Sequence, residues 1–163
     1  MSRCPKSAFT TAMIVAALTG VAHAAQQPAT IAPDKVAITA VMSQYNQALN
    51  ASSTDDCLAL YAEDGVFMPP HSPSAVGKAA VRRAYEQVFK TITLHVKFTI
   101  AEIVQMSPQW AFVRTNSAGS NKVNATGAMS AEGNQELFIF KKGADGQWKI
   151  ERYSFSPTNP PRE

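Results

Sequence analysis

The sequence lacks most features that identify a biochemical activity directly. It contains only two cysteines, Cys4 and Cys57, so the disulfide framework of many small secreted domains is excluded. It has no glycine-rich phosphate loop, no serine or cysteine nucleophile motif and no heptad run. Beyond the N-terminal region, no stretch is apolar enough to cross a bilayer. The function must therefore be inferred from the fold and from individual side chains.

Clustered basic residues and metal-ligating groups are also missing. Lysines and arginines number 15 against 12 acidic residues, and Arg3 and Lys6 lie at the extreme N-terminus. Nucleic-acid binding requires cations gathered along one surface, so we predict no nucleic-acid partner. His71 and His95 are scattered, with no carboxylate at ligand spacing. We therefore predict no metal site and no cofactor.

The N-terminus has the three parts of a secretory signal peptide. Arg3 and Lys6 supply positive charge, residues 8–21 are mostly apolar, and Ala22-His23-Ala24 fits the small-x-small cleavage rule. A membrane anchor is the alternative, but the apolar run is too short to span a bilayer. We predict residues 1–24 to be a bacterial-type signal peptide cleaved after Ala24. The mature protein is then periplasmic or secreted and free of the membrane.

The rest of the chain has the length of one ordinary domain with its own core. Residues 25–33 contain two prolines and indicate a mobile leader. We predict the domain over residues 34–156 and a short tail over 157–163.

The first half of the domain has the pattern of three helices. Apolar residues recur at helical spacing over 35–50, with Asp34 as the predicted cap. Ser52-Ser53-Thr54 indicates the cap of a second, short helix ending near Tyr61. A third amphipathic helix is predicted over 79–90, after a short strand at 66–68 and a proline-rich loop.

The second half alternates with a period of two. Strands are predicted over 94–100, 110–116, 135–141 and 148–155, with Asp145-Gly146 in a hairpin turn. Residues 119–133 are polar and glycine-containing, which indicates either a flexible connection or a frayed strand pair. Helices followed by strands predict an α+β fold, with the helices on one face of an antiparallel sheet.

Four segments carry a family resemblance: Tyr45-Asn46-Gln47-Ala48, Leu60-Tyr61-Ala62-Glu63-Asp64-Gly65-Val66-Phe67, Val76-Gly77-Lys78-Ala79-Ala80-Val81 and Asp145-Gly146-Gln147-Trp148-Lys149-Ile150. Their order resembles the nuclear transport factor 2-like superfamily, also called SnoaL-like or ketosteroid-isomerase-like, and within it the SgcJ/EcaC-type subfamily. The resemblance implies a cystatin-like fold, in which a cone-shaped, curved antiparallel sheet wraps around about three N-terminal helices. It also implies a homodimer through the outer sheet face. It does not fix an activity, because the fold hosts isomerases, cyclases, dehydratases and association modules.

The same resemblance implies a pair of catalytic candidates inside the cone. Tyr45 matches a helix-borne tyrosine of the ketosteroid isomerases, and Glu136 matches an acid that binds a substrate oxygen while protonated. Those isomerases carry a carboxylate base just after the first strand. This chain has Met68-Pro69-Pro70 there, and none of these side chains accepts a proton. The isomerase mechanism therefore lacks its base.

The predicted ligand-binding residues come from strand alternation combined with the resemblance. On the concave face we expect Phe67, Phe112, Arg114, Asn116, Phe138 and Phe155. An Arg114–Glu136 contact is then either a salt bridge at the cavity floor or a clamp for a ligand oxygen. His71, in the loop after the first strand, is either a base that reaches inward or a solvated loop residue.

Two functions remain open from the sequence. In one, an exported SnoaL-like domain binds a small, largely apolar, oxygen-bearing molecule, with metal-free acid–base chemistry in the style of an isomerase, cyclase or hydrolase. In the other, the chain is a non-catalytic homodimeric association module with a filled cavity. The size of the cavity separates the two, because binding sites are mostly apolar spaces with a few polar groups. The sequence does not decide whether the protein is an enzyme.

Overall fold

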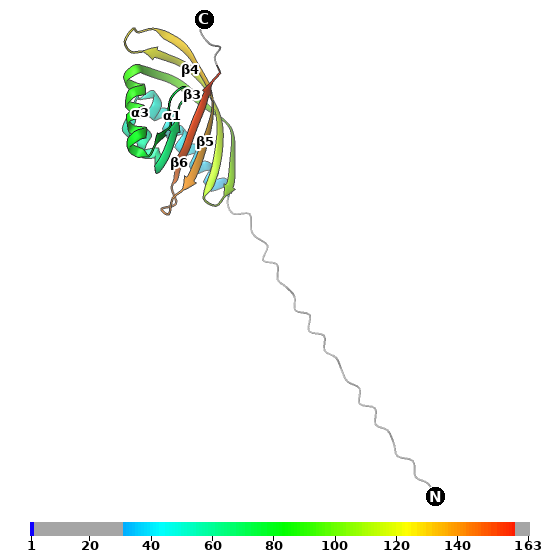
Figure 1. Ribbon diagram of the computed structural model, residues 1–163. Helices are drawn as coiled ribbons and strands as arrows, with labels where there is room; N and C mark the ends of the chain where they lie inside the picture. Colours follow the sequence, from blue (N-terminus) through cyan, green and yellow to red (C-terminus); the bar gives the residue numbers. More distant parts are fainter. Residues whose placement is uncertain (2–30, 159–163) are drawn as a thin grey trace.

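The computed structural model describes residues 31–158 together with Met1. The predicted signal peptide therefore lies outside the described residues except for Met1, as do residues 25–30 of the predicted leader and 159–163 of the predicted tail. In the described part, three helices pack against one curved six-stranded sheet (Figure 1). The α+β, cystatin-like expectation is confirmed.

The helices are α1 (Ile31–Asn50), α2 (Thr54–Leu60) and α3 (Lys78–Thr91). The hydroxyl of Ser53 caps α2 by accepting a 3.3 Å hydrogen bond from the Asp56 backbone N–H, as the sequence indicated. The first helix starts earlier than predicted, so Asp34 lies in its first turn instead of capping it. Residues 31–33 thus belong to α1 and not to the leader.

The strands are β1 (Tyr61–Met68), β2 (Ala75–Val76), β3 (Ile92–Ser107), β4 (Trp110–Val123), β5 (Met129–Lys142) and β6 (Trp148–Pro157). Their order across the sheet is β2-β1-β6-β5-β4-β3. All neighbours are antiparallel except β1 and β6, which run parallel, so the sheet is mixed but mostly antiparallel. The last strand fits between β5 and β1, and its antiparallel pairing with β5 fixes its direction relative to β1.

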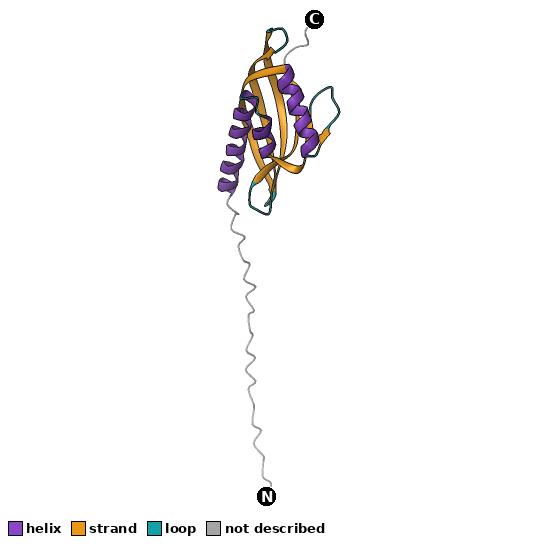
Figure 2. Cartoon of the chain, turned by 90° about the vertical axis from the view of Figure 1, so that its left-hand side faces the viewer, coloured by secondary structure: helices purple, strands orange, loops and turns teal. Residues whose placement is uncertain are grey.

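The helices cover the concave face of the sheet, as Figure 2 shows from the side of the helices. The first helix contributes Ile38, Met42, Tyr45 and Leu49 to the core, a spacing of three or four residues that puts all of them on one face. Burial of such an apolar stripe supplies most of a helix's stability, at about 25 cal/mol per Å² removed from water. The same stripe places Tyr45 at the centre of the cone.

The hairpin of β4 and β5 is neither flexible nor frayed. Its strands pair continuously from Gly119–Glu132 to Lys122–Met129. Asn124 at its tip lies against the end of α3: its side-chain amide donates a 2.9 Å hydrogen bond to the Phe89 carbonyl, and its backbone N–H donates to Thr91. The last carbonyls of a helix have no partner within the helix, so Asn124 satisfies them and fixes the hairpin over α3.

The exposed edge of β3 is closed by two asparagines of α1. Asn46 and Asn50 donate to the Val96 carbonyl at 2.7 and 2.8 Å, and the Val96 N–H donates to Asn50 Oδ1 at 2.9 Å. Phe98 N–H donates to Asn46 Oδ1 at 3.2 Å. Side-chain amides therefore replace the neighbouring strand that this edge lacks.

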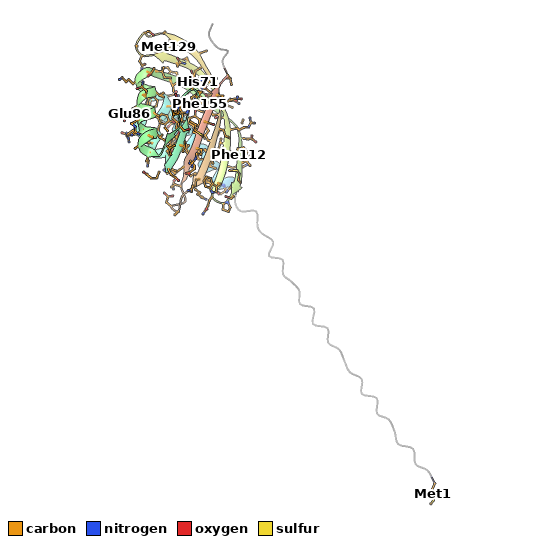
Figure 3. The ribbon with its side chains drawn as sticks, in the orientation of Figure 1. Met1, His71, Glu86, Phe112, Met129 and Phe155 are labelled. Carbon is orange, nitrogen blue, oxygen red and sulfur yellow. The ribbon has the colours of Figure 1, made fainter. Side chains whose placement is uncertain are left out.

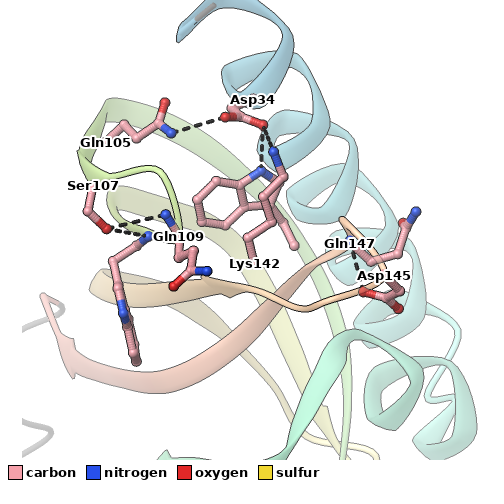
Figure 4. Close-up of polar contacts among 9 residues, drawn as sticks. Asp34, Gln105, Ser107, Gln109, Lys142, Asp145 and Gln147 are labelled. Atoms are coloured by element: carbon pink, nitrogen blue, oxygen red, sulfur yellow. Dashed lines mark hydrogen bonds and ion pairs between the residues drawn. The ribbon is translucent and has the colours of Figure 1, made fainter. Parts of the chain in front are cut away.

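A polar cluster fixes the start of α1 against the far end of the sheet (Figure 4). The Asp34 carboxylate accepts hydrogen bonds from Lys142 Nζ at 2.6 Å, Gln105 Nε2 at 3.0 Å and Trp148 Nε1 at 3.1 Å. The hydrogen bond from Lys142 is the largest of the contacts that lower the pKa of Asp34. This residue, expected to cap a helix, instead ties three strands to it.

The helices within residues 31–158 include none with the length and apolar character needed to cross a membrane.

Candidate functional site

A cavity of about 130 Å³ lies between the helices and the concave face of the sheet. Its walls are Tyr45, Leu49, Phe67, Tyr85, Val88, Ile92, Leu94, Val96, Phe98, Ser117, Glu132, Asn134, Tyr153 and Phe155. The volume is below the several hundred Å³ of sites for drug-sized ligands. It is close to that of an engineered apolar cavity of about 150 Å³ that binds benzene. The space therefore suits a single ring and its substituents.

Three buried tyrosines form a hydrogen-bonded chain beside the cavity. The Tyr45 and Tyr85 hydroxyl oxygens lie 2.6 Å apart, and those of Tyr85 and Tyr61 lie 2.9 Å apart. The three come from α1, α3 and the first residue of β1. Tyr45 and Tyr85 line the cavity, whereas Tyr61 lies behind them. The Tyr45 hydroxyl also acts as a hydrogen-bond partner of Tyr153, whose pKa it lowers, so Tyr45 belongs to a cluster of four tyrosine hydroxyls beside the cavity.

Burial keeps these hydroxyls protonated. Loss of solvation raises the pKa of Tyr45 and the pKa of Tyr85 well above the usual value for tyrosine, and it also raises the pKa of Tyr61. A neutral phenol is a hydrogen-bond donor, and hydrogen bonds along a chain strengthen one another. Tyr45 is therefore a neutral phenol in the wall of an apolar space.

The wall next to these tyrosines is a stack of aromatic rings that shares Tyr85 with them. Phe67 stacks on Tyr85 with ring centroids 5.0 Å apart and on Tyr153 at 5.4 Å. Tyr153 in turn stacks on Phe138 at 4.2 Å, and Phe155 completes the series. Offset stacks of this kind hold rings rigidly, so the wall is preformed.

A small group of polar residues interrupts the aromatic wall on β4 and β5. We call Ser117, Glu132 and Asn134 the polar wall. Asn134 Nδ2 donates to Glu132 Oε1 at 2.9 Å and to the Ser117 hydroxyl at 3.4 Å. Asn121 Nδ2 donates to the other oxygen of Glu132. The Glu132 carboxylate is thus held in place by two neutral amides.

Glu136 lies in the next row of the concave face, as the sequence predicted. It is 5 % exposed and stands between Thr115 on β4 and Phe155 on β6. The Thr115 hydroxyl donates a 2.5 Å hydrogen bond to Glu136 Oε2, whereas Oε1 has no partner with hydrogen-bonding geometry in the described residues. Burial raises the pKa of Glu136, and nearby Ser117 and Thr115 partly oppose the shift. Glu136 does not itself line the cavity, but its charge acts on Tyr153, which does.

Three predicted ligand-binding residues lie on the wrong face. Phe112, Arg114 and Asn116 point to the outer side of β4, and Arg114 pairs there with Glu102 and not with Glu136. Figure 3 shows Phe112 on the side of the sheet away from α3. Both alternatives for an Arg114–Glu136 contact are therefore wrong.

The reason for this error is the packing of the helices. The inner side of β4 carries the smaller residues Ala111, Val113 and Thr115, all buried, because the core rings and the helices lie against this part of the sheet. A guanidinium inside would need a buried counter-charge, and the outer face solvates Arg114 at less cost.

Some of the other predicted site residues line the cavity, and the rest lie outside it. Tyr45, Phe67 and Phe155 line the cavity. Phe138 is fully buried behind Tyr153. His71 is exposed, has a positive φ of 58° and is not among the lining residues, which fits a solvated loop residue (Figure 3).

Sequence reasoning missed several residues of the site. Tyr85 had only the helical spacing of a core residue. Of the polar wall, Glu132 lay within residues 119–133, which were expected to be a flexible connection or a frayed strand pair, and Ser117 and Asn134 lay just outside that stretch. The sequence feature that could have indicated the polar wall is the polar series Asn121, Glu132 and Asn134, whose side chains face the interior from β4 and β5. Among residues 31–158, no group of three or more His, Cys, Asp or Glu side chains is placed to hold a metal ion.

A family model for the SnoaL-like domain matches residues 42–150. The chain belongs to the SnoaL-like domain family. Among solved structures, a ketosteroid isomerase-like protein from Erwinia carotovora atroseptica is 38 % identical, with a TM-score of 0.74 over 77 % of this chain and 96 % of that one. No curated protein matches the sequence.

More distant solved structures share the fold alone. A domain with a cystatin-like fold from Nostoc punctiforme is 19 % identical, with a TM-score of 0.65 over 79 % of this chain and 80 % of that one. A type 2 hexachlorocyclohexane dehydrochlorinase is 9 % identical, with a TM-score of 0.71 over 78 % and 86 % of the two chains. The same architecture therefore accommodates very different sequences.

Proposed function

We propose that this SnoaL-like domain binds a small, largely apolar, oxygen-bearing ring compound, with Tyr45 donating a hydrogen bond to the ligand oxygen. The observation that supports this most is that Tyr45, which belongs to a cluster of hydrogen-bonded tyrosine hydroxyls, lines an apolar cavity. A carbonyl or hydroxyl oxygen in the cavity would offer this cluster a further acceptor for one of its protons.

The residual volume favours binding over a purely structural core. A cone filled by its own side chains would leave no ring-sized space, whereas this one retains about 130 Å³. The likeness to a ketosteroid isomerase-like protein at 38 % identity agrees with a ligand-binding interior.

The chemistry supported by this arrangement is transfer of a proton from the ligand to a base from the solvent, with Tyr45 stabilising the negative charge that develops on the ligand oxygen. Glu136 influences the cavity indirectly, because its charge raises the pKa of Tyr153 and so helps to keep that hydroxyl protonated. Met68, Pro69 and Pro70 provide no proton acceptor after β1, so the base of the isomerases has no counterpart there. The proposed function is therefore ligand binding, and catalytic turnover is a separate hypothesis.

Paired probes test the binding proposal. Cyclohexanone and methylenecyclohexane have nearly the same shape, and only the ketone accepts a hydrogen bond. We expect Tyr45→Phe to weaken cyclohexanone about tenfold and leave the hydrocarbon unchanged, since one hydrogen bond contributes roughly 0.5–1.5 kcal/mol. Titration followed by amide chemical shifts measures both, with Tyr61→Phe as the control. Failure of both probes to enter the cavity rejects the proposal.

Deuterium exchange tests the chemistry. In D₂O, removal of a proton from the carbon beside the cyclohexanone carbonyl and return of a deuteron changes the mass of the recovered ketone. Exchange that is faster with the natural protein than with Tyr45→Phe supports proton transfer. Exchange at the buffer rate for both leaves a binding protein without turnover.

We also propose that the protein self-associates through the outer face of the sheet. Val104, Met106 and Leu137 are 37–53 % exposed there, and apolar patches on a sheet face are typical of subunit interfaces. Sedimentation velocity should show a dimer that Leu137→Asp dissociates. A monomer at high concentration would contradict the proposal.

Export and subfamily membership complete the proposal. We infer a periplasmic or secreted protein of the SgcJ/EcaC type from the N-terminal pattern Ala22-His23-Ala24 and from the four matching segments. N-terminal sequencing of the protein recovered from its host should begin at Ala25. Recovery of the uncleaved chain from the cytoplasm would contradict export.

A further inference from the structure

The polar wall of the cavity is rich in hydrogen-bond acceptors. Its carboxylate, Glu132, accepts from two amides and keeps further lone pairs. Asn134 uses its Nδ2 atom as the donor to Glu132 and Ser117, so its Oδ1 atom is left as an acceptor. That Oδ1 atom has no donor among the described residues, although Asn134 is 8 % exposed and lines the cavity. A buried amide oxygen without a donor is uncommon and indicates a missing partner.

The charge of this region is also unbalanced. No lysine, arginine or histidine of residues 31–158 lines the cavity, and none of the ion pairs in that range includes Glu132 or Glu136. Glu136 is buried and Glu132 is half-buried, and a carboxylate that is drawn out of water is normally paired with a cation. The cation that would complete this arrangement is therefore not part of the described chain.

The aromatic wall beside these acceptors suits a cation. Phe67, Tyr153 and Phe155 form stacks with centroids 5.4–6.2 Å apart, and Tyr153 and Phe155 line the cavity beside the polar wall. Ring faces attract an ammonium group within about 6 Å of the centroid. An anion would meet negative charge, its own sign, both at the ring faces and at Glu132, and would be repelled.

We propose that the ligand of this cavity is a ring compound carrying a cationic amine, with its ammonium group on Glu132 and Asn134 and its ring against Tyr153 and Phe155. The inference rests on the proposed function and narrows its ligand class, since the oxygen of the same compound meets Tyr45 on another wall. An ammonium group donates three hydrogen bonds and supplies the positive charge that the wall lacks. A volume near 130 Å³ limits the compound to about one ring.

Three probes of one shape test the charge preference. Benzylammonium, benzyl alcohol and benzoate present a cation, a neutral donor and an anion on the same ring. At pH 7, calorimetric titration of the full folded protein should show benzylammonium binding about tenfold more tightly than benzyl alcohol, a difference of roughly 1.4 kcal/mol. Benzoate should not bind measurably.

A matched pair of variants locates the effect. Glu132→Gln should remove the preference for benzylammonium and leave benzyl alcohol within twofold. Glu86→Gln removes the same charge from the exposed side of α3 (Figure 3) and should leave the preference intact. Equal losses in both variants would show a general charge effect and overturn the inference.

The comparison of probes on the natural protein does not depend on any variant folding. Benzoate binding as tightly as benzylammonium, or benzyl alcohol as tightly as the amine, overturns the inference alone if cyclohexanone still binds. If no ring compound binds, both the inference and the proposed function fail.

Discussion

The hydroxyl oxygens of Tyr45 and Tyr85 lie 2.6 Å apart in the interior, although the two residues are 40 positions apart in the sequence. This contact joins the second half of α1 to the middle of α3 beside the cavity. Tyr85 also contacts the Tyr61 hydroxyl at 2.9 Å, so it is the middle member of the chain. The position of each member determines what its removal costs.

Tyr85→Phe should destabilise the protein by about 1–3 kcal/mol, because it leaves the hydroxyls of Tyr45 and Tyr61 buried without their shared partner. Tyr61→Phe removes only the terminal hydroxyl and keeps the Tyr45–Tyr85 contact, so its cost should be smaller. Urea unfolding of the two variants gives the comparison. Equal losses would show that the chain does not act as a connected unit.

Because of Glu136, we expect the free energy of unfolding to fall as the pH rises. Its pKa in the folded protein is raised by burial, so the native state binds the proton more tightly than the unfolded state does. The contribution to stability is fully present below the unfolded pKa, about 4.3, and is lost as the pH rises through the folded pKa. Glu136→Gln should remove this slope, as measured by denaturant unfolding between pH 3 and 8. An unchanged slope would contradict the assignment.

Because of Asp34, we expect a contribution to the free energy of unfolding that rises with pH. Its pKa is lowered, mainly by the hydrogen bond from Lys142, so its contribution is present above the unfolded pKa and is lost as the pH falls through the folded one. Asp34→Asn keeps the size of the side chain but removes the charge, and should cost about 1–3 kcal/mol at pH 7. Thermal unfolding at pH 7 and pH 3 tests this. A cost that is the same at both values would show that the charge is unimportant.

Asn50→Ala should open the edge of β3. It leaves the Val96 N–H without its 2.9 Å partner, and we expect a loss of about 1–2 kcal/mol together with faster aggregation. Gln47→Ala, on the exposed side of the same helix, is the control and should change neither quantity. Unfolding and light scattering measure the two effects. Aggregation equal to that of the control would indicate that the edge is protected in another way.

The general architecture could be predicted because it depends on local patterns. Helical spacing in 35–50 and period-two alternation in 94–100 each follow from one surface being buried. The positions of Tyr45, Glu136 and Phe155 on the concave face were also correct.

The remaining errors concern facts that the local pattern does not contain. Alternation in β4 separates Arg114 from Val113 but does not say which of the two faces the helices. The register decides this, since Thr115 pairs with Glu136 and so places Arg114 outside. The hydrogen bond between Tyr61 and Tyr85 likewise depends on how β1 packs against α3. The spacing of residues within either element does not contain this information.

The parallel pairing of β1 with β6 has a consequence for synthesis. The strand made first among the six and the strand made last are neighbours, and β6 is the only link between the β2-β1 pair and the other three strands. Until Trp148–Pro157 has left the ribosome, the sheet consists of two unconnected parts. A chain interrupted before Trp148 should therefore be degraded as an incomplete fragment, and the sheet is completed only after translation of the domain has ended.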